Sequence, residues 1–304
     1  MMNGRSDNPL NRIQKIAMSV ACGAVLSAAF LVTSIYRTFA AQPKRPGSAS
    51  STKTAASDTS GTQPTAPTAP PSLPDSSSLS TKKICWGQGT HFDNLNRPQD
   101  AVDAQRKYGS LGGHFVDDTE EKILYLTFDE GYENGYSDDI LDTLRQKGVK
   151  ATSFITGDYA KREGELVQRM IDEGHTVGNH TWKHYSMPEK SLDTCREEIT
   201  QLSDYVAEQY HYQMTTLRPP KGEFSERTLA LATEMGYSTW LWSFAYKDWD
   251  VNTPGDPTAS LQKLCDRLHP GGIYLLHAVS STNAAILGDF IDQAQAEGYR
   301  FVTP

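Results

Sequence analysis

Residues 123–132 read ILYLTFDEGY, and this stretch decides the fold. Its first half is apolar and rich in strand-forming side chains, which is typical of a buried strand. Asp129, Glu130 and a glycine that can turn the chain follow directly. Parallel α/β sheets and barrels place their chemistry at the carboxyl ends of their strands, so we expect both carboxylates at such an edge. Because side chains alternate along a strand, the two carboxylates should point to different places and can take different roles; one could hold a metal while the other takes a proton.

Strand and helix patterns alternate from residue 122 to residue 304. Repeated βα units imply a largely parallel sheet with helices outside it, and this number of strands favours closure into a barrel. The predicted fold class is therefore α/β. The expected strands are 123–129, 151–156, 175–178, one entering 218–220, 238–243, 273–277 and 299–302, and the expected helices are 137–147, 163–173, 188–210, 225–235 and 283–297.

Charge is unevenly distributed along the 304 residues, whose net charge is −8. Residues 1–82 carry 8 Lys and Arg against 3 Asp and Glu, whereas residues 83–304 carry 21 against 34, a net charge of −13. Affinity for phosphate comes from Lys and Arg, so the acidic part argues against nucleic acid as a partner. The 4 cysteines are too few for a disulfide framework, and their spacing matches no zinc motif.

The first 36 residues predict membrane attachment. Residues 1–15 form a polar, basic head, and residues 16–36 contain no charged side chain, enough to cross a bilayer as a helix. We expect the head in the cytoplasm, residues 16–36 as a single transmembrane anchor or uncleaved signal, and the rest of the chain outside the cell membrane. Cleavage near Ala40, which would release the protein, is the alternative.

Between this anchor and the acidic part, residues 37–82 are rich in Ser, Thr, Ala and Pro. They lack the apolar side chains that would offset chain entropy, so we predict a disordered linker. Residues 83–121 are expected to form a leading segment packed on the edge of the domain made by residues 122–304.

A pair of histidines, His180 and His184, lies in the stretch GNHTWKH at 178–184. Four positions apart on a helix, such a pair shares one face and can bind one metal through neutral imidazole nitrogens. By itself HxxxH is common, and a surface pair is its ordinary interpretation. Here it follows a predicted strand, at the edge where Asp129 and Glu130 emerge. Two histidines and one carboxylate would leave an open position on Zn²⁺ for water.

Three more polar motifs stand at predicted strand ends. Arg218 begins RPPKG and can pair with a buried carboxylate, as a structural ion pair or as the group that holds Asp129. Trp249, between two acids, suits a sugar-binding wall. His277 ends an apolar strand and is a natural general acid if a carboxylate such as Asp248 keeps it protonated.

Taken in order, these motifs resemble the polysaccharide deacetylases of carbohydrate esterase family 4, the NodB-homology family. The matching pieces are TFDEG (127–131), HxxxH (180–184), RPPKG (218–222), DW (248–249) and LLH (275–277). The longer run DEGYENGY at 129–136 is similar to the sporulation branch of that family. That branch removes the acetyl group from muramic acid in peptidoglycan, on the way to the muramic δ-lactam of spore cortex. The implied fold is a distorted (β/α) barrel.

Catalytic roles follow from the resemblance position by position. Asp129 would be the general base that activates water, and Arg218 would hold it in place. His277 would protonate the leaving amine, and Asp248 would tune His277.

Metal binding is likewise implied for His180, His184 and Glu130, with Zn²⁺ as the expected divalent metal. Most of the family has an aspartate at position 130, and the longer glutamate must fold back to reach the metal. The residues that we expect to contact substrate are Tyr132, Asn134, Gly222 and Trp249.

We therefore expect a metal-dependent hydrolase, a monomer, that removes N-acetyl groups from the N-acetylmuramic acid of peptidoglycan glycan strands. The same residues would serve a deacetylase of N-acetylglucosamine in peptidoglycan, of chitin-like polymers or of acetylated xylan. A non-catalytic glycan-binding module is the alternative of a different class. Such a module would be recognised by the loss of the catalytic acid, the catalytic base or the metal ligands. In this sequence only position 130 departs from the family pattern.

Overall fold

The structure, a computed structural model, describes residues 75–304. The predicted cytoplasmic head, the predicted anchor at 16–36 and the predicted linker up to residue 74 lie outside this range. Within residues 75–304, no helix combines the length and the apolar character needed to cross a membrane.

The end of the predicted linker is not free of the domain. Residues 75–82 were expected to be disordered, but the start of this segment packs on helix α6 (Glu226–Glu234). The backbone N–H and the hydroxyl of Ser76 donate to the Glu234 carboxylate at 2.8 and 3.0 Å. The N–H of Arg227 donates to the carbonyl of Ser80 at 3.1 Å. These polar contacts hold a segment whose apolar content alone predicts no fixed structure.

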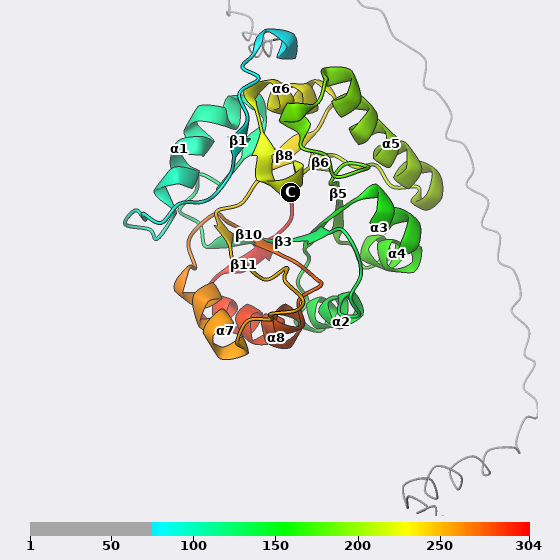
Figure 1. Cartoon of the computed structure of the whole chain (residues 1–304). Coiled ribbons are helices and arrows are strands. Elements are labelled where there is room, and N and C mark those ends of the chain that lie inside the picture. The colour runs from blue at the N-terminus through cyan, green and yellow to red at the C-terminus, as the bar shows by residue number, and fades with distance from the viewer. Residues whose placement is uncertain (1–74) are drawn as a thin grey trace, which may run out of the picture. The chain divides into compact units, whose positions relative to one another are not determined.

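A nine-stranded parallel sheet curls around the centre of the domain, with helices outside it (Figure 1). Its order is β2-β8-β6-β5-β4-β3-β10-β9, and β11 pairs with the start of β3. No hydrogen-bonded pairing joins β2 to β9 within the described part of the chain, so the predicted barrel is a curled sheet that does not close. The strands are β2 (Gly113–His114), β3 (Ile123–Glu130), β4 (Thr152–Ile155), β5 (Thr176–Asn179), β6 (Thr216–Leu217), β8 (Ser238–Trp240), β9 (Phe244–Ala245), β10 (Gly272–Leu276) and β11 (Arg300–Val302).

Outside this sheet, β1 (Ile84–Cys85) pairs antiparallel with β7 (Glu223–Phe224). The predicted leading segment, 83–121, therefore does more than pack on an edge, because it also supplies β2, the terminal strand of the sheet. The helices are α1 (Gln99–Tyr108), α2 (Ser137–Lys147), α3 (Gly157–Arg162), α4 (Gly164–Asp172), α5 (Leu192–Tyr210), α6, α7 (Pro257–Asp266) and α8 (Ser281–Ala296).

Helix α2 has the predicted bounds, and it ends at Gly148, whose φ of 66° is the left-handed conformation that glycine adopts without strain. Helices α1, α3 and α7 were not predicted. Both α3 and α7 carry N-cap signals, since the side chain of Thr156 accepts from the N–H of Tyr159 and that of Asp256 accepts from the N–H of Ala259.

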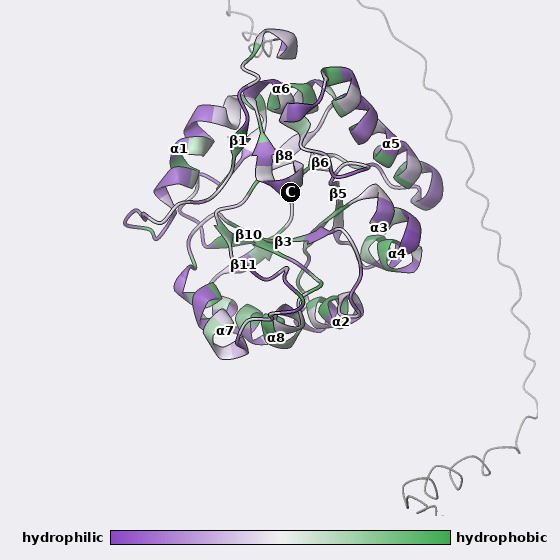
Figure 2. Ribbon diagram, in the orientation of Figure 1, coloured by the Kyte–Doolittle hydropathy of each residue, from purple (hydrophilic) through white to green (hydrophobic). Residues whose placement is uncertain are grey.

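Strand β3 has two buried faces with different partners. Leu124, Leu126 and Phe128 belong to an apolar cluster shared with α2 and α8, in the layer between sheet and helices. Figure 2 shows the apolar stretch of β3 and β10 at the centre of the ring of amphipathic helices. A shift of one residue would turn these three side chains to the wrong face, so they fix the register of β3. The alternation places Thr127 and Asp129 on the opposite face, inside the curled sheet.

Candidate active site

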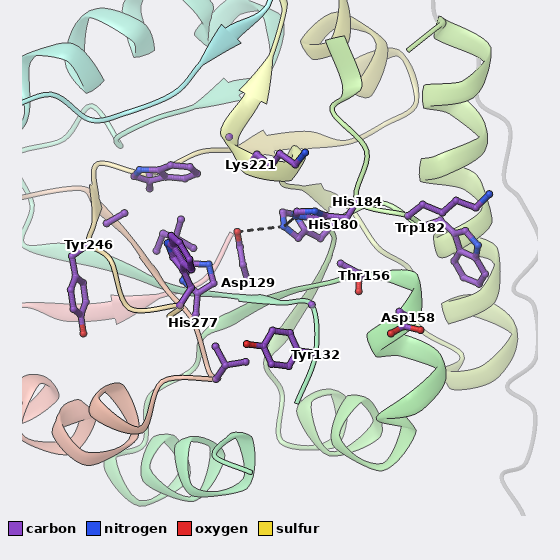
Figure 3. A pocket seen from close by; sticks show the side chains of 18 residues that line it. Asp129, Tyr132, Thr156, Asp158, His180, Trp182, His184, Lys221, Tyr246 and His277 are labelled. Atoms are coloured by element: carbon purple, nitrogen blue, oxygen red, sulfur yellow. Dashed lines mark hydrogen bonds and ion pairs between the residues drawn. The ribbon is translucent and has the colours of Figure 1, made fainter. Parts of the chain in front are cut away.

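A cleft of about 800 Å³ opens where the strands of the sheet end. The side chains that line it lie at the ends of β3, β4, β5, β6, β8, β9 and β10 and in the segments that follow these strands, and Figure 3 shows them from close by. Among the predicted site residues, the lining includes Asp129, Tyr132, His180, His184, Gly222, Trp249 and His277. Segments spread over about half of the chain therefore meet at one place.

Asp129 is held by a buried guanidinium. The Nη1 of Arg218, a side chain with no solvent exposure, donates to Asp129 Oδ1 at 2.9 Å. Burial would raise the pKa of Asp129, but the charge of Arg218, together with His180 and His277, outweighs it, and the pKa is lowered. Asp129 is therefore an anion at neutral pH, as a general base must be.

Arg218 is itself fully embedded in acceptors. Besides Asp129, its guanidinium donates to the hydroxyl of Thr127 at 2.8 Å and to the carbonyls of Trp240 and Leu241 at 2.9 and 3.0 Å. It also lies over the ring of Phe154, 4.2 Å from the ring centroid. The predicted contact with Asp129 is present, and the extra bonds fix the direction from which the charge acts.

His180 receives its orientation from the same residue. Its Nδ1 lies 2.8 Å from the carbonyl oxygen of Arg218, which can only accept, so Nδ1 carries the proton and Nε2 presents a lone pair. That Nε2 lies 3.5 Å from Asp129 Oδ2, the pair joined by the dashed line in Figure 3.

The two histidines lie in a loop after β5 and not on a helix, so this part of the sequence prediction is wrong. Thr181 and His184 have φ values of 66° and 57°, which no helix accommodates. The loop is held by its own polar groups: Thr181 N–H donates to Asn179 Oδ1, and Lys183 N–H donates to a carboxylate oxygen of Glu198. The imidazoles nevertheless converge: their ring centroids lie 4.8 Å apart, and the His180 ring lies beside Asp129.

The histidine pair fits a divalent cation. His184 Nε2 lies 3.2 Å from His180 Nε2. Two imidazole nitrogens bound to one tetrahedral Zn²⁺ at about 2.0–2.1 Å would lie about 3.3 Å apart. Burial lowers the pKa of His180, and burial with the neighbouring His180 lowers the pKa of His184 to about 4. Both rings are therefore neutral at pH 7, the form that binds metal.

Glu130 does not join the histidines, which corrects its prediction as the third ligand. It follows Leu124, Leu126 and Phe128 in the alternation and so faces the helix layer. There it lines a separate small cavity with Ser137 and His175 and is 2% exposed. Within residues 75–304, no group of three His, Cys, Asp or Glu side chains has the geometry of a metal site. A two-histidine site beside Asp129 is what this chain offers.

His277 and Asp248 form a second pair in the cleft. His277 Nδ1 and its backbone N–H both donate to the Asp248 carboxylate, to Oδ1 and Oδ2, each at 2.8 Å. Burial alone would lower the pKa of His277, but the hydrogen bond and charge of Asp248, with the charge of Asp129, raise it. A protonated imidazole whose Nε2 faces the cleft can donate a proton. In Figure 3, His277 lies on the opposite side of Asp129 from His180.

Of the expected substrate contacts, three line the cleft and one does not. Tyr132 and Trp249 are 51% and 56% exposed, an unusual state for large aromatic side chains. Gly222 has a φ of 64°, and a Cβ there would lie 2.5 Å from the ring of Trp242. Asn134 does not line the cleft; its amide donates to the carbonyl of Val279 at 2.9 Å and joins two loops instead.

The sequence did not single out Lys221, Tyr246 or Asn283, which the structure adds to the site. Lys221 and Tyr246 line the cleft, and the amide of the buried Asn283 donates to Asp248 Oδ2 at 2.6 Å. Lys221 has a φ of 61°, a left-handed conformation that is uncommon for lysine and that the sequence does not indicate. Asn283 lies in the first turn of a helix, where an asparagine is common and does not indicate a functional role.

Comparisons with known proteins agree with this geometry. The polysaccharide deacetylase family model matches residues 116–240. The peptidoglycan-N-acetylmuramic acid deacetylase PdaA of Bacillus subtilis is 39% identical over 209 residues, 66% of this chain and 78% of that protein. A peptidoglycan-N-acetylglucosamine deacetylase of Bacillus cereus is 32% identical over 186 residues, 60% of this chain and 86% of that protein. The solved structure of Bacillus subtilis PdaA, a family 4 carbohydrate esterase, superposes with a TM-score of 0.70 and 35% identity, covering 74% of this chain and 96% of that one.

Proposed function

The chain belongs to the polysaccharide deacetylases of carbohydrate esterase family 4, and on that premise we propose that it hydrolyses the N-acetyl group of N-acetylmuramic acid in peptidoglycan glycan strands. The single observation that carries the proposal is the paired arrangement in the cleft. An ionised carboxylate held by Arg218 lies between a histidine pair and a protonatable histidine held by Asp248. Amide hydrolysis needs a base for water and an acid for the departing nitrogen, and both are in place.

In this reaction Asp129 takes a proton from the attacking water through the oxygen that Arg218 leaves free. The water oxygen then forms a bond to the acetyl carbon, and negative charge develops on the carbonyl oxygen. The backbone N–H of Lys221, which makes no hydrogen bond within residues 75–304, is available in the cleft wall to stabilise that charge. His277 gives its Nε2 proton to the nitrogen, the C–N bond breaks, and acetate and a free amine leave.

His180 and His184 are the residues that would hold a divalent cation, for which Zn²⁺ is our proposal. Such a cation supplies polarisation of the acetyl carbonyl and acidifies water. The Nδ1–H bond of His180 to the Arg218 carbonyl keeps the imidazole in the tautomer that binds metal.

Exposed aromatic side chains are proposed to bind the sugar rings. Tyr132 and Trp249 lie in the segments that follow β3 and β9, and both line the cleft. Sugar rings pack their apolar faces against aromatic rings, so these side chains suit a glycan strand lying across the cleft.

Residues 1–74 enter the proposal through their sequence only. We propose that 16–36 anchor the protein in the cell membrane, that the catalytic domain acts outside it as a monomer, and that the product leads to the muramic δ-lactam of spore cortex. Release by cleavage near Ala40 is the alternative location.

A panel of glycans tests the substrate. Peptidoglycan, intact and stripped of stem peptides, is incubated with the protein and digested to disaccharides, and mass spectrometry locates new free amines. Amines on muramic acid support the proposal. Amines on glucosamine alone would favour the second candidate, suggested by the 32% identity to the Bacillus cereus enzyme. Binding to glycan strands with no acetate released would support the non-catalytic module.

A further inference from the structure

Asn283 stands behind the proton donor of the cleft and has no part in the steps described above. It lies in the first turn of α8 and is 1% exposed. Its Nδ2 donates to Asp248 Oδ2 at 2.6 Å and to the carbonyl of His277 at 3.1 Å. One amide therefore bonds both members of the pair that holds the transferable proton.

The orientation of this amide is not free. The hydroxyl of Tyr246 donates to Asn283 Oδ1. Burial, with the charge of Asp248, raises the pKa of Tyr246, so the phenol keeps its proton and must act as the donor. With Oδ1 occupied as an acceptor, Nδ2 must point at Asp248. Tyr246, Asn283, Asp248 and His277 thus form a continuous chain of hydrogen bonds, of which Tyr246 and His277 line the cleft.

We propose that Asn283 is a positioning residue of the deacetylation: it fixes the Asp248 carboxylate against His277 and weakens the carboxylate's hold on the imidazolium proton, and Tyr246 fixes Asn283. This inference rests on the proposed function. Two groups donate to Asp248 Oδ2. The backbone N–H of His277 keeps the carboxylate in place, and the amide of Asn283 weakens its hold on the imidazolium proton.

The sign of the effect follows from the charges. A donor on Oδ2 takes up part of the negative charge of Asp248, so less of it acts on the imidazolium through Oδ1. Without Asn283 the imidazolium should hold its proton more tightly and be a weaker acid. Besides Asp248, the charged groups that act on His277 are Asp129, Arg218, His180 and His184, and none of them hydrogen-bonds to Asn283 in the described part of the chain. The phenols of Tyr132 and Tyr246 also line the cleft, and Tyr246 is the one that bonds Asn283.

The test is the pH profile of acetate release by the full-length protein, with Asn283→Ala and the more conservative Tyr246→Phe. We expect kcat to fall about threefold to tenfold for Asn283→Ala, a fraction of the full contribution of a general acid, with KM unchanged. The alkaline limb of kcat should move to higher pH. Tyr246→Phe should shift it in the same direction by less, and should add no further shift in the Asn283→Ala background.

Two controls separate chemistry from folding. Thr282→Ala removes a neighbouring buried hydroxyl that donates to Gly255, and Tyr210→Phe removes a phenol that donates to Ala160, both outside the chain of bonds to His277. Neither should move the alkaline limb. If Asn283→Ala does not fold, the shift in Tyr246→Phe decides.

A second readout needs no activity. Diethyl pyrocarbonate modifies neutral imidazole, so the pH at which the peptide containing His277 is modified, followed by mass spectrometry, reports its protonation. Asn283→Ala should raise that pH. An unchanged or lowered pH in both readouts would overturn the inference, whereas a parent protein that releases no acetate would overturn the proposed function and leave this readout intact.

Discussion

Replacing Glu130 by glutamine separates the structural account from the role that family resemblance implies. The structure places this carboxyl in the helix layer, away from the histidine pair. A residue that binds no metal there should tolerate an isosteric change. We therefore expect Glu130→Gln to release acetate within about twofold of the parent and to bind as much zinc as the parent binds, whereas loss of a true acid–base or ligand group costs about a hundredfold or more.

The same substitution should stabilise the fold at neutral and higher pH. Burial, with the charges of Glu133 and Asp129, raises the pKa of Glu130 well above its ordinary value of 4.5. The folded protein therefore keeps a proton that the unfolded chain has lost. The stability contributed by this group is fully present below pH 4.5 and is lost as pH rises through the folded-state pKa.

The magnitude follows from that linkage. Each pH unit between the two pKa values costs about 1.4 kcal/mol. In a domain of this size, 1 kcal/mol shifts Tm by about 2–4 °C. Glutamine has no such proton to take up, so the variant's advantage in Tm should be absent at pH 4 and grow by about 3–6 °C per pH unit above the ordinary pKa, until the folded-state pKa is passed.

The assays are acetate release, metal content after gel filtration, and thermal unfolding between pH 4 and pH 8. Glu133→Gln is the matched control, because Glu133 is a neighbouring carboxylate that receives hydrogen bonds from the backbone and from Ser137. It should lose stability at neutral pH. A Glu130→Gln variant that loses its metal together with at least tenfold of its activity would refute the placement, and a stability difference that does not change with pH would refute the charge argument.

Three further substitutions test other parts of the site. Arg218→Lys should destabilise the fold by about 3–5 kcal/mol in urea titrations, because a lysine ammonium has three N–H donors and cannot make the four hydrogen bonds of this buried guanidinium. A change below about 1 kcal/mol would contradict this. His184→Ala should lower the zinc content measured by atomic emission and reduce kcat about a hundredfold. The control Glu173→Gln, which changes an acid outside the cleft, should alter neither quantity. Full zinc occupancy in His184→Ala would contradict the ligand assignment. Trp249→Ala should raise KM for glycan strands several-fold with kcat nearly unchanged, since the side chain is exposed and touches no reacting group; a fall in kcat alone would contradict a binding role.

Much of the fold was predictable because its signals are local. The apolar run of β3 and the period of α2 with Gly148 at its end decide these elements without tertiary information. Helix α7 was missed because its N-terminal half is polar and follows an aromatic, turn-rich segment. The histidine loop was taken for a helix because the left-handed conformations of Thr181 and His184 depend on bonds to Asn179 and to distant Glu198.

Part of the site was likewise predictable from local sequence signals, and part was not. Alternation along β3 predicts that Asp129 and Glu130 face apart, and the structure confirms it. Family resemblance implied that Glu130 joins the histidines as a metal ligand, whereas the alternation alone gives the direction in which its side chain points. The link from Asn283 to Asp248 joins residues 35 positions apart, and no sequence pattern marks it.

Asp129 is the base that activates water in the proposed reaction, so the most direct measurement is acetate release from glycan strands by Asp129→Asn. Asparagine keeps the shape of the side chain and can still accept from Arg218, but it cannot take a proton. We predict a folded protein, shown by an unchanged circular dichroism spectrum, whose rate is at least about a hundredfold lower. Acetate release at the rate of the parent would contradict it.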